Sequence, residues 1–210
     1  MPVVHLVRHG QASFGAEDYD HLSNLGREQA RVVGEALAAR GLRSPVAISG
    51  TLRRQRDTGT IAVPDLPLQV DGRWDEYDHL GLLKRYVVDS ETRHDGTSAS
   101  MQRLLDLALA SWVRDGDHGG WPVFSGGVVL ALADLVSSLS SGRDAVVFTS
   151  GGVIAAVCAE LLGLGADGVV ALNRVAVNGA ITKLAFGARG TTLVTFNEHA
   201  HLPPDAVTYR

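Results

Sequence analysis

The sequence predicts an α/β fold in which helices cover both faces of a central sheet. Continuously apolar stretches of the kind found in buried parallel strands alternate with segments whose apolar residues recur at helical spacing. Polar or glycine-rich sequences end three of the strand-like stretches, at residues 8–10, 49–50 and 149–152. Ligands bind at the carboxyl ends of the strands in such sheets, so we expect these three sequences to converge on one site.

The first part of the chain begins with the apolar, β-branched stretch 3–7, which suits a buried strand. A polar loop follows, and Ser23 then stands where a helix N-cap is expected. Apolar residues at helical spacing continue as far as Gly41, a residue suited to closing a helix. The next expected elements are a short strand, an arginine-rich helix and a third strand, at residues 46–48, 51–61 and 68–70.

Residues 71–98 are charged and weakly patterned, which is typical of an inserted lobe or a lid. Beyond them, two helices carry apolar faces from Met101 to Trp112 and from Phe124 to Leu139. The remaining expected elements are a strand, a buried helix and two closing strands, at residues 145–148, 153–164, 180–186 and 191–196. We therefore predict a single domain over residues 1–210, with residues 71–98 as its lobe.

The composition restricts the class of protein. A chain of 210 residues, 45% of them hydrophobic, can bury one sizeable core. Its net charge of −4 lacks the basic excess of a nucleic-acid-binding protein. Cys158 is the single cysteine, so no intrachain disulfide can form, and a reducing compartment, the cytoplasm, is expected. The longest uncharged run, residues 145–159, contains a glycine turn, so no membrane span is expected. The N-terminus lacks a basic region and its apolar run, residues 2–7, is short, so no signal peptide is expected.

The first strand ends in Arg8, His9 and Gly10. The planar guanidinium of Arg8 suits phosphate or carboxylate oxygens, and His9 can act as a nucleophile or carry a proton near neutral pH. Gly10 allows a sharp turn that brings the backbone close to a ligand. Together these residue types predict a site for an anion, although a solvated Arg-His pair after a strand is the plainer alternative.

Several short motifs follow one another in a fixed order along the chain. They are residues 6–10 and 22–30, the triplet Leu52, Arg54 and Thr58, residues 75–77, and the C-terminal stretches 178–182, 196–198 and 201–202. In this order they resemble the motifs of the histidine phosphatase superfamily, also called phosphoglycerate mutase-like. The resemblance implies a three-layer α/β/α sandwich around a mostly parallel sheet with one antiparallel strand.

The resemblance also implies a phosphohistidine mechanism without a metal or other cofactor, because arginines supply the positive charge. His9 would attack phosphorus, and Arg8 and Arg54 would hold the phosphoryl oxygens. Glu76 would protonate the leaving oxygen and then help to activate water. The phosphate pocket would also be lined by Gly10, Gln11 and Ser13. Arg54 lies in an arginine cluster and Glu76 in an acidic one, so each could instead be an ordinary solvated side chain.

One position departs from the family pattern. The family usually has a second histidine before the Gly-Gly that follows the late strand, and here Ser150 stands in its place, followed by Gly151. The Ser150 hydroxyl and the backbone N–H groups at the helix start can still bind phosphoryl oxygens. A potential cation is lost, and removing one such donor typically costs on the order of 100- to 1000-fold in rate. His199 is the foremost candidate to compensate, with His201 and His5 as further candidates.

A second departure bears on the substrate. Phe14 and Gly15 stand where cofactor-dependent mutases of the family carry a Trp-Asn or similar pair, and the chain lacks long insertions. A phosphatase for a small, soluble phosphate monoester, such as a sugar phosphate or a phosphoglycerate derivative, is therefore favoured. A mutase-type phosphotransferase and a catalytically weakened phosphate-ester binding protein stay open. No nucleic-acid or membrane partner is expected, and the oligomeric state, a homodimer included, is left undecided.

Overall fold

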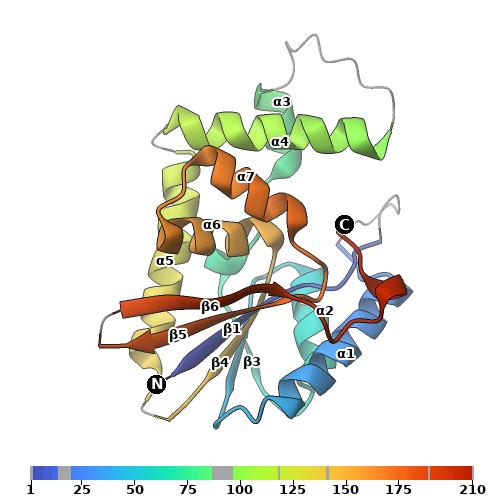
Figure 1. The fold of residues 1–210 in the computed structure, drawn as a ribbon, viewed down its shortest axis with the longest axis vertical. Helices are drawn as coiled ribbons and strands as arrows, with labels where there is room; N and C mark the ends of the chain where they lie inside the picture. The colour runs from blue at the N-terminus through green and yellow to red at the C-terminus, as the bar shows by residue number, and fades with distance from the viewer. Residues whose placement is uncertain are drawn as a thin grey trace.

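The computed structural model describes residues 2–13, 20–86, 97–117, 119–140, 142–188 and 190–209. Its centre is a six-stranded sheet in the order β3-β2-β4-β1-β5-β6 (Figure 1). The strands are β1 (Val3–Arg8), β2 (Val46–Ser49), β3 (Leu68–Val70), β4 (Ala145–Thr149), β5 (Ile181–Gly187) and β6 (Gly190–Glu198). Strands β1 to β4 pair in parallel, whereas β5 pairs antiparallel with both β1 and β6. The expectation of a mostly parallel sheet with one antiparallel strand is confirmed.

Helices cover both faces of this sheet, which gives the three expected layers (Figure 1). The helices are α1 (Asn24–Ala39), α2 (Arg53–Ala62), α3 (His79–Tyr86), α4 (Ser98–Asp115), α5 (Trp121–Ser138), α6 (Gly151–Leu162) and α7 (Ala166–Val175), with 3-10 turns at Gly72–Trp74 and Pro204–Ala206. On one face, Val7 of β1 packs in a cluster with Val33 of α1 and with α2. On the other face, Leu6 packs in a cluster with Val128 of α5 and with α6. Because β1 is buried on both faces, its sequence is largely apolar rather than alternating.

The start and end of α1 follow from local sequence signals, as expected. Ser23 caps the helix and accepts a hydrogen bond from Gly26 N at 3.0 Å. The helix ends at Ala39, and Gly41 takes a left-handed φ of 61°. A Cβ on Gly10 would lie 2.9 Å from the carbonyl carbon of Gly26, so only glycine allows the turn after β1 to cross α1 this closely. This crossing fixes the position of the loop that follows β1.

Three helices form a cap beyond the carboxyl ends of the parallel strands, and the sequence predicts only α4 among them. In Figure 1, α4 crosses in front of α3 and lies above α7. One apolar cluster joins them through Leu82 of α3, Leu109 of α4 and Val169 of α7. Helices α3 and α7 are 8 and 10 residues long, and helices this short depend on tertiary packing. Residues 87–96 of the expected lobe lie outside the described residues, so the lobe stays a prediction.

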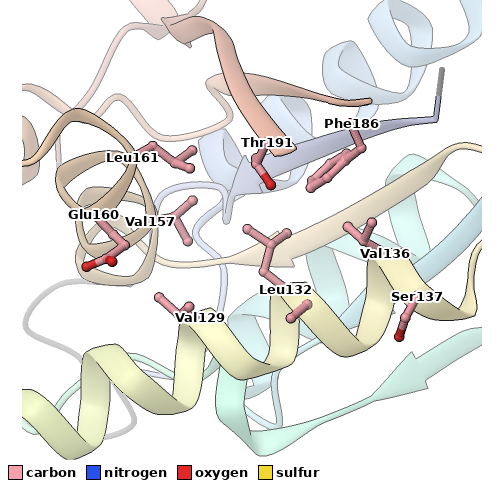
Figure 2. Close-up of a pocket in the computed structure, with 10 residues that line it drawn as sticks. Val129, Leu132, Val136, Ser137, Val157, Glu160, Leu161, Phe186 and Thr191 are labelled. Carbon is pink, nitrogen blue, oxygen red and sulfur yellow. The ribbon is translucent and has the colours of Figure 1, made fainter. Parts of the chain in front are cut away.

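Helix α5 is apolar and contributes one stripe to the core. Among the described helices it is the one long and apolar enough to cross a membrane, a test that core helices also pass. Its buried residues are Val128, Ala131 and Leu132. An apolar cavity of about 360 Å³ is lined by residues of α5, of α6 and of the hairpin of β5 and β6. Figure 2 shows Leu132 and Val136 of α5 pointing toward this cavity, with Phe186 of β5 on its other side.

Candidate active site

The strand ends singled out by the sequence converge on one edge of the sheet. His9 N donates to Thr149 O at 2.9 Å, and Gly50 N donates to Phe148 O at 3.3 Å. A cavity of about 260 Å³ opens at this edge. Its lining is formed by the polar residues Arg8, His9, Arg54, Glu76, Tyr77, His79, Gln102, Asn173, Arg174 and Tyr209 and the apolar residues Leu80, Leu83, Met101 and Leu105. A concave site with a few convergent polar groups is the usual form of a small-molecule site.

The His9 ring is held in one tautomer. Its side chain is buried, and Nδ1 lies 2.8 Å from Gly10 O. A carbonyl oxygen can only accept, so Nδ1 carries the proton and Nε2 is unprotonated. Nε2 accepts a hydrogen bond from Arg54 Nε at 3.1 Å. Burial, followed by the charges of Arg54 and Arg8, holds the pKa of His9 well below its ordinary value, which keeps the ring neutral and Nε2 nucleophilic.

Arg54 is positioned by the first turn of α2. Its buried guanidinium donates from Nη1 to Asp20 Oδ1 at 2.7 Å. Asp20 Oδ2 also accepts from Arg53 N at 2.7 Å, so the same carboxylate caps the helix. One turn later, Thr58 Oγ1 donates to Arg54 O at 2.7 Å and accepts from Gly10 N at 3.0 Å. The spacing of Arg54 and Thr58 therefore places a cation and an anchor for the loop after β1 on one face of α2.

Arg8 approaches the cavity from the end of β1. Its Nη1 donates to the carbonyl oxygen of Ala176 and, at 3.0 Å, to that of Tyr209. A Cβ on Gly151 would lie 3.5 Å from Arg8 Nε, so the first residue of α6 adjoins the guanidinium. Two arginines thus bring positive charge to the cavity that holds His9. Within the described ranges, no three His, Cys, Asp or Glu side chains are grouped to hold a metal ion.

Glu76 follows the 3-10 turn Gly72–Trp74 and lies against the N-terminus of α6. Its Oε2 accepts a hydrogen bond from Gly152 N at 3.1 Å, and its Oε1 accepts one from Tyr77 N at 3.2 Å. Burial raises the pKa of Glu76, and this effect outweighs the opposing hydrogen bond from Gly152 and the charges of Arg54 and Arg8. A carboxyl group whose pKa is raised is suited to donate a proton closer to neutral pH.

Ser150 is turned toward the protein interior. Its side chain is fully buried, and its Oγ accepts a hydrogen bond from Gln55 Nε2 at 2.8 Å. The same Gln55 nitrogen donates to Trp74 O at 3.0 Å. Ser150 therefore connects the start of α6 with α2 and with the turn that precedes Glu76. Neither Ser150 nor Gly151 is among the residues that line the cavity.

The other residues expected to bind substrate lie outside the cavity lining. Gln11 Oε1 accepts a hydrogen bond from the hydroxyl that caps α1, at 2.8 Å. Ser13 N donates to His21 O at 2.7 Å. His199 Nδ1 lies 2.6 Å from Asn197 O. Phe14 and Gly15, whose identity favours hydrolysis over mutase chemistry, fall outside the described residues.

A histidine that the sequence did not single out lines the cavity instead. His201 Nε2 lies 3.0 Å from Gly179 O, and His5 belongs to a different cavity at the start of β1. His79, the first residue of α3, lines the cavity together with His9. Burial and the positive charge of Arg54 lower the pKa of His79.

The outer part of the cavity has almost no signal in the sequence. Gln102 comes from α4, and Asn173 and Arg174 come from α7. Nothing in their spacing distinguishes a polar side chain that faces a cavity from one that faces solvent. Asn178 lies outside the cavity lining but belongs to a stretch that resembles the family, and its Nδ2 donates to His9 O at 3.2 Å.

Comparison with known proteins identifies the group to which this arrangement belongs. The chain matches the family model of the histidine phosphatase superfamily (branch 1) over residues 4–199. It is 33% identical over 181 residues to a glucosyl-3-phosphoglycerate phosphatase of Mycolicibacterium vanbaalenii, covering 77% of this chain and 75% of that protein. The mycobacterial glucosyl-3-phosphoglycerate phosphatase in complex with inorganic phosphate is similar in structure, with a TM-score of 0.68, 25% identity, and coverage of 97% and 100% of the two chains. A phosphoserine phosphatase mutant of Entamoeba histolytica shares the fold, with a TM-score of 0.65, 18% identity, and coverage of 97% and 100%.

Proposed function

Because this chain belongs to the histidine phosphatase superfamily and is a phosphoric monoester hydrolase, we propose that it hydrolyses small phosphate monoesters through a phosphohistidine on His9. The observation that carries this proposal is the state of the His9 ring. It is neutral, its Nδ1 proton is bonded to Gly10 O, and its Nε2 faces Arg54 in the cavity. A nitrogen nucleophile needs a free lone pair beside groups that hold the phosphoryl oxygens.

In the first step, Nε2 of His9 attacks phosphorus while the bond from phosphorus to the ester oxygen breaks. Arg54 donates to Nε2 before the reaction, so its guanidinium must turn from the ring to a phosphoryl oxygen as the new bond forms. Arg8, at the end of β1 beside His9, binds the same phosphoryl group. Positive charge that develops on the ring is stabilised by the hydrogen bond from Nδ1 to Gly10 O.

Glu76 provides the proton that the departing alkoxide needs. Its raised pKa favours the protonated form, and its hydrogen bonds to Gly152 N and Tyr77 N hold the carboxyl group in place. In the second step the resulting carboxylate accepts a proton from water, which attacks phosphorus and releases phosphate and free His9. One group can serve as acid and then base because the two steps are chemically the reverse of each other.

Ser150 contributes to this site through its neighbours. Its hydroxyl oxygen accepts from Gln55 and its side chain lies outside the cavity lining, so its role in the proposal is to hold the start of α6, where Gly151 adjoins Arg8 and Gly152 binds Glu76. The site then lacks one donor to the phosphoryl group, and His79 is the cavity-lining imidazole available to offset that loss.

The outer cavity supports an organic group that carries hydroxyl or carboxylate functions. Gln102, Asn173 and Arg174 can donate hydrogen bonds there, while Leu80 and Leu83 provide an apolar wall. A sugar phosphate or phosphoglycerate derivative fits these groups, and the curated relative is a glucosyl-3-phosphoglycerate phosphatase. We further propose a cytoplasmic enzyme without nucleic-acid or membrane partners, for which a homodimer stays open.

The test is phosphate release from a panel of small phosphomonoesters between about pH 4 and 8, with matched variants of the same residue type. His9→Ala is expected to abolish release, whereas His21→Ala, which changes a histidine outside the cavity lining, retains it. Arg54→Ala is expected to lose about 1000-fold, whereas Arg56→Ala, on the exposed face of the same helix, remains active. Rapid quenching should trap an acid-labile phosphate on His9.

Two other results would redirect the assignment. Product that keeps its phosphate, in a reaction that depends on a bisphosphate, indicates a mutase. Tight binding of esters without turnover indicates a binding protein in which the missing donor has removed the chemistry.

A further inference from the structure

A second polar cavity lies at the opposite end of β1 from His9. It has a volume of about 320 Å³ and is lined by Val3, His5, Arg40, Gly41, Leu42, Arg43, Asp144 and Lys183. Strand β1 contributes His5 to this cavity and ends at Arg8, beside the catalytic cavity. The segment 40–43 that follows α1, Asp144 before β4 and Lys183 of β5 form the other walls. The proposed phosphatase mechanism uses none of these residues.

Two residues that line this cavity each have a buried nitrogen atom without a hydrogen-bond partner among the residues described. His5 is 2% exposed, and its Nδ1 is unpaired within the described part of the chain. Arg40 Nε is likewise buried and has no hydrogen-bond partner among the residues described. Leaving a buried polar group unpaired costs free energy, so such atoms are rare and usually indicate a missing partner. Both residues line the cavity, so an acceptor placed there could bind both nitrogens.

Positive charges outnumber negative charges around the cavity. Arg40, Arg43 and Lys183 are cationic, whereas Asp144 and Glu198 are the carboxylates beside them. Lys183 lies directly opposite His5 in the pairing of β1 with β5, and no ion pair links it to a carboxylate among the residues described. One positive charge is therefore in excess before His5 is counted.

Both carboxylates are already engaged. Asp144 accepts hydrogen bonds from Val3 N at 3.0 Å, from Arg43 N at 2.9 Å and from Arg43 Nη2 at 2.8 Å. Glu198 Oε1 pairs with Arg40 Nη2 at 2.5 Å. These contacts build the wall of the cavity, and they leave Lys183 and the two unpaired nitrogens to interact with a ligand.

Burial and the neighbouring cations both disfavour the protonated form of His5. Burial and the charges of Arg40 and Lys183 lower the pKa of His5 to about 4, against the opposing charges of Asp144 and Glu198. An anion in the cavity would add negative charge beside the ring, and the pKa of His5 would rise on binding. Anion binding should therefore strengthen as the pH falls.

We propose that this cavity is a second binding site for a small oxyanion of the phosphate or sulfate class. Lys183 and Arg40 supply charge, and Arg40 Nε and the His5 ring supply hydrogen bonds to its oxygens. Oxygen acceptors at this position satisfy both orphaned nitrogens and neutralise the excess cation. The ligand is either a free oxyanion or the phosphate group of an ester.

The experiment counts inorganic phosphate bound per chain by calorimetric titration at constant ionic strength. The full chain is expected to bind two phosphates, one in the catalytic cavity and one here. Arg54→Met should remove the catalytic site and leave this one. Lys183→Gln should weaken the site here at least tenfold while leaving turnover of a small ester unchanged. The matched control is Lys84→Gln, because Lys84 is the other lysine of the sequence and is exposed.

The pKa of His5 provides a second measurement that is independent of stoichiometry. It should rise when phosphate is added to Arg54→Met, as followed by NMR of ¹⁵N-labelled imidazole. Sulfate competing equally with phosphate identifies a site for free oxyanions, and preference for glycerol 2-phosphate identifies an ester site. A single phosphate per chain that disappears in Arg54→Met, with the His5 titration unmoved, overturns the proposal and leaves the proposed phosphatase function intact.

Discussion

Replacing Gly152 by alanine should displace the carboxyl group proposed as the acid. A Cβ on Gly152 would lie 2.7 Å from Tyr77 Cδ1, and nearer still to Glu76 Oε1, whereas ordinary contacts begin at 3.4 Å. The ring and the carboxyl group must therefore withdraw by at least 0.7 Å, the difference between these two distances. The Tyr77 ring can withdraw little, because it packs at 5.4 Å from the Trp112 ring and 5.8 Å from the Phe124 ring. Most of the movement falls on Glu76.

The expected loss in kcat for Gly152→Ala is about 100-fold, because a misplacement near 1 Å costs about that much in a positioned catalytic group. The assay is steady-state phosphate release, with thermal unfolding to establish that the variant is folded. Gly126→Ala is the control, because a Cβ there meets nothing within 4 Å. Gly152→Ala combined with Glu76→Gln should be no slower than Glu76→Gln alone, because both act on one group. Full activity in folded Gly152→Ala, or additive losses in the double variant, would refute this reasoning.

Three further outcomes are expected. Activity should fall at low pH as His9, whose pKa is lowered, becomes protonated, and it should fall at high pH as Glu76, whose pKa is raised, loses its proton. In Glu76→Gln, the fall of kcat at high pH should disappear. This variant should lose the least rate on an ester with a good leaving group, which needs no proton from Glu76. His79→Ala should lower kcat/KM by about 10- to 100-fold while His199→Ala leaves it unchanged, which steady-state kinetics can separate. Asp144→Asn should lower the free energy of unfolding by about 2 kcal/mol in denaturant melts. Against the opposing effect of burial, hydrogen bonds from Arg43 and Val3 hold the pKa of Asp144 below its ordinary value, so the stability that this carboxylate contributes is present above pH ~4 and is lost as the pH falls through the lowered pKa.

Much of the catalytic framework was predictable because it depends on local sequence. Ser23 and Gly41 set the ends of α1 through capping and a left-handed turn. Arg54 and Thr58 are one helical turn apart, so they face the same loop wherever α2 is placed. Nearest-neighbour rules of this kind act within a few residues and need no knowledge of the rest of the chain.

The direction of buried side chains was decided by the tertiary structure. The sequence indicates Ser150 as a residue of the phosphate site, whereas in the fold its side chain is fully buried outside the cavity lining and its hydroxyl oxygen accepts a hydrogen bond from Gln55 Nε2. His79 enters the cavity because α3 packs under α4, and neither the helix nor its packing has a local signal. The raised pKa of Glu76 likewise depends on burial produced by several segments together.

The sequence by itself determined the alternation of strands and helices, the strand ends that carry Arg8 and His9, and the motifs of the family, because each depends on short-range order along the chain. The tertiary structure decided which histidine lines the catalytic cavity and which polar groups of α4 and α7 join it. It also brought Lys183 opposite His5, more than 170 residues apart, with Arg40 beside them. Such contacts arise when distant segments bury apolar surface together, and a single sequence carries no local record of which distant side chains that burial will bring face to face.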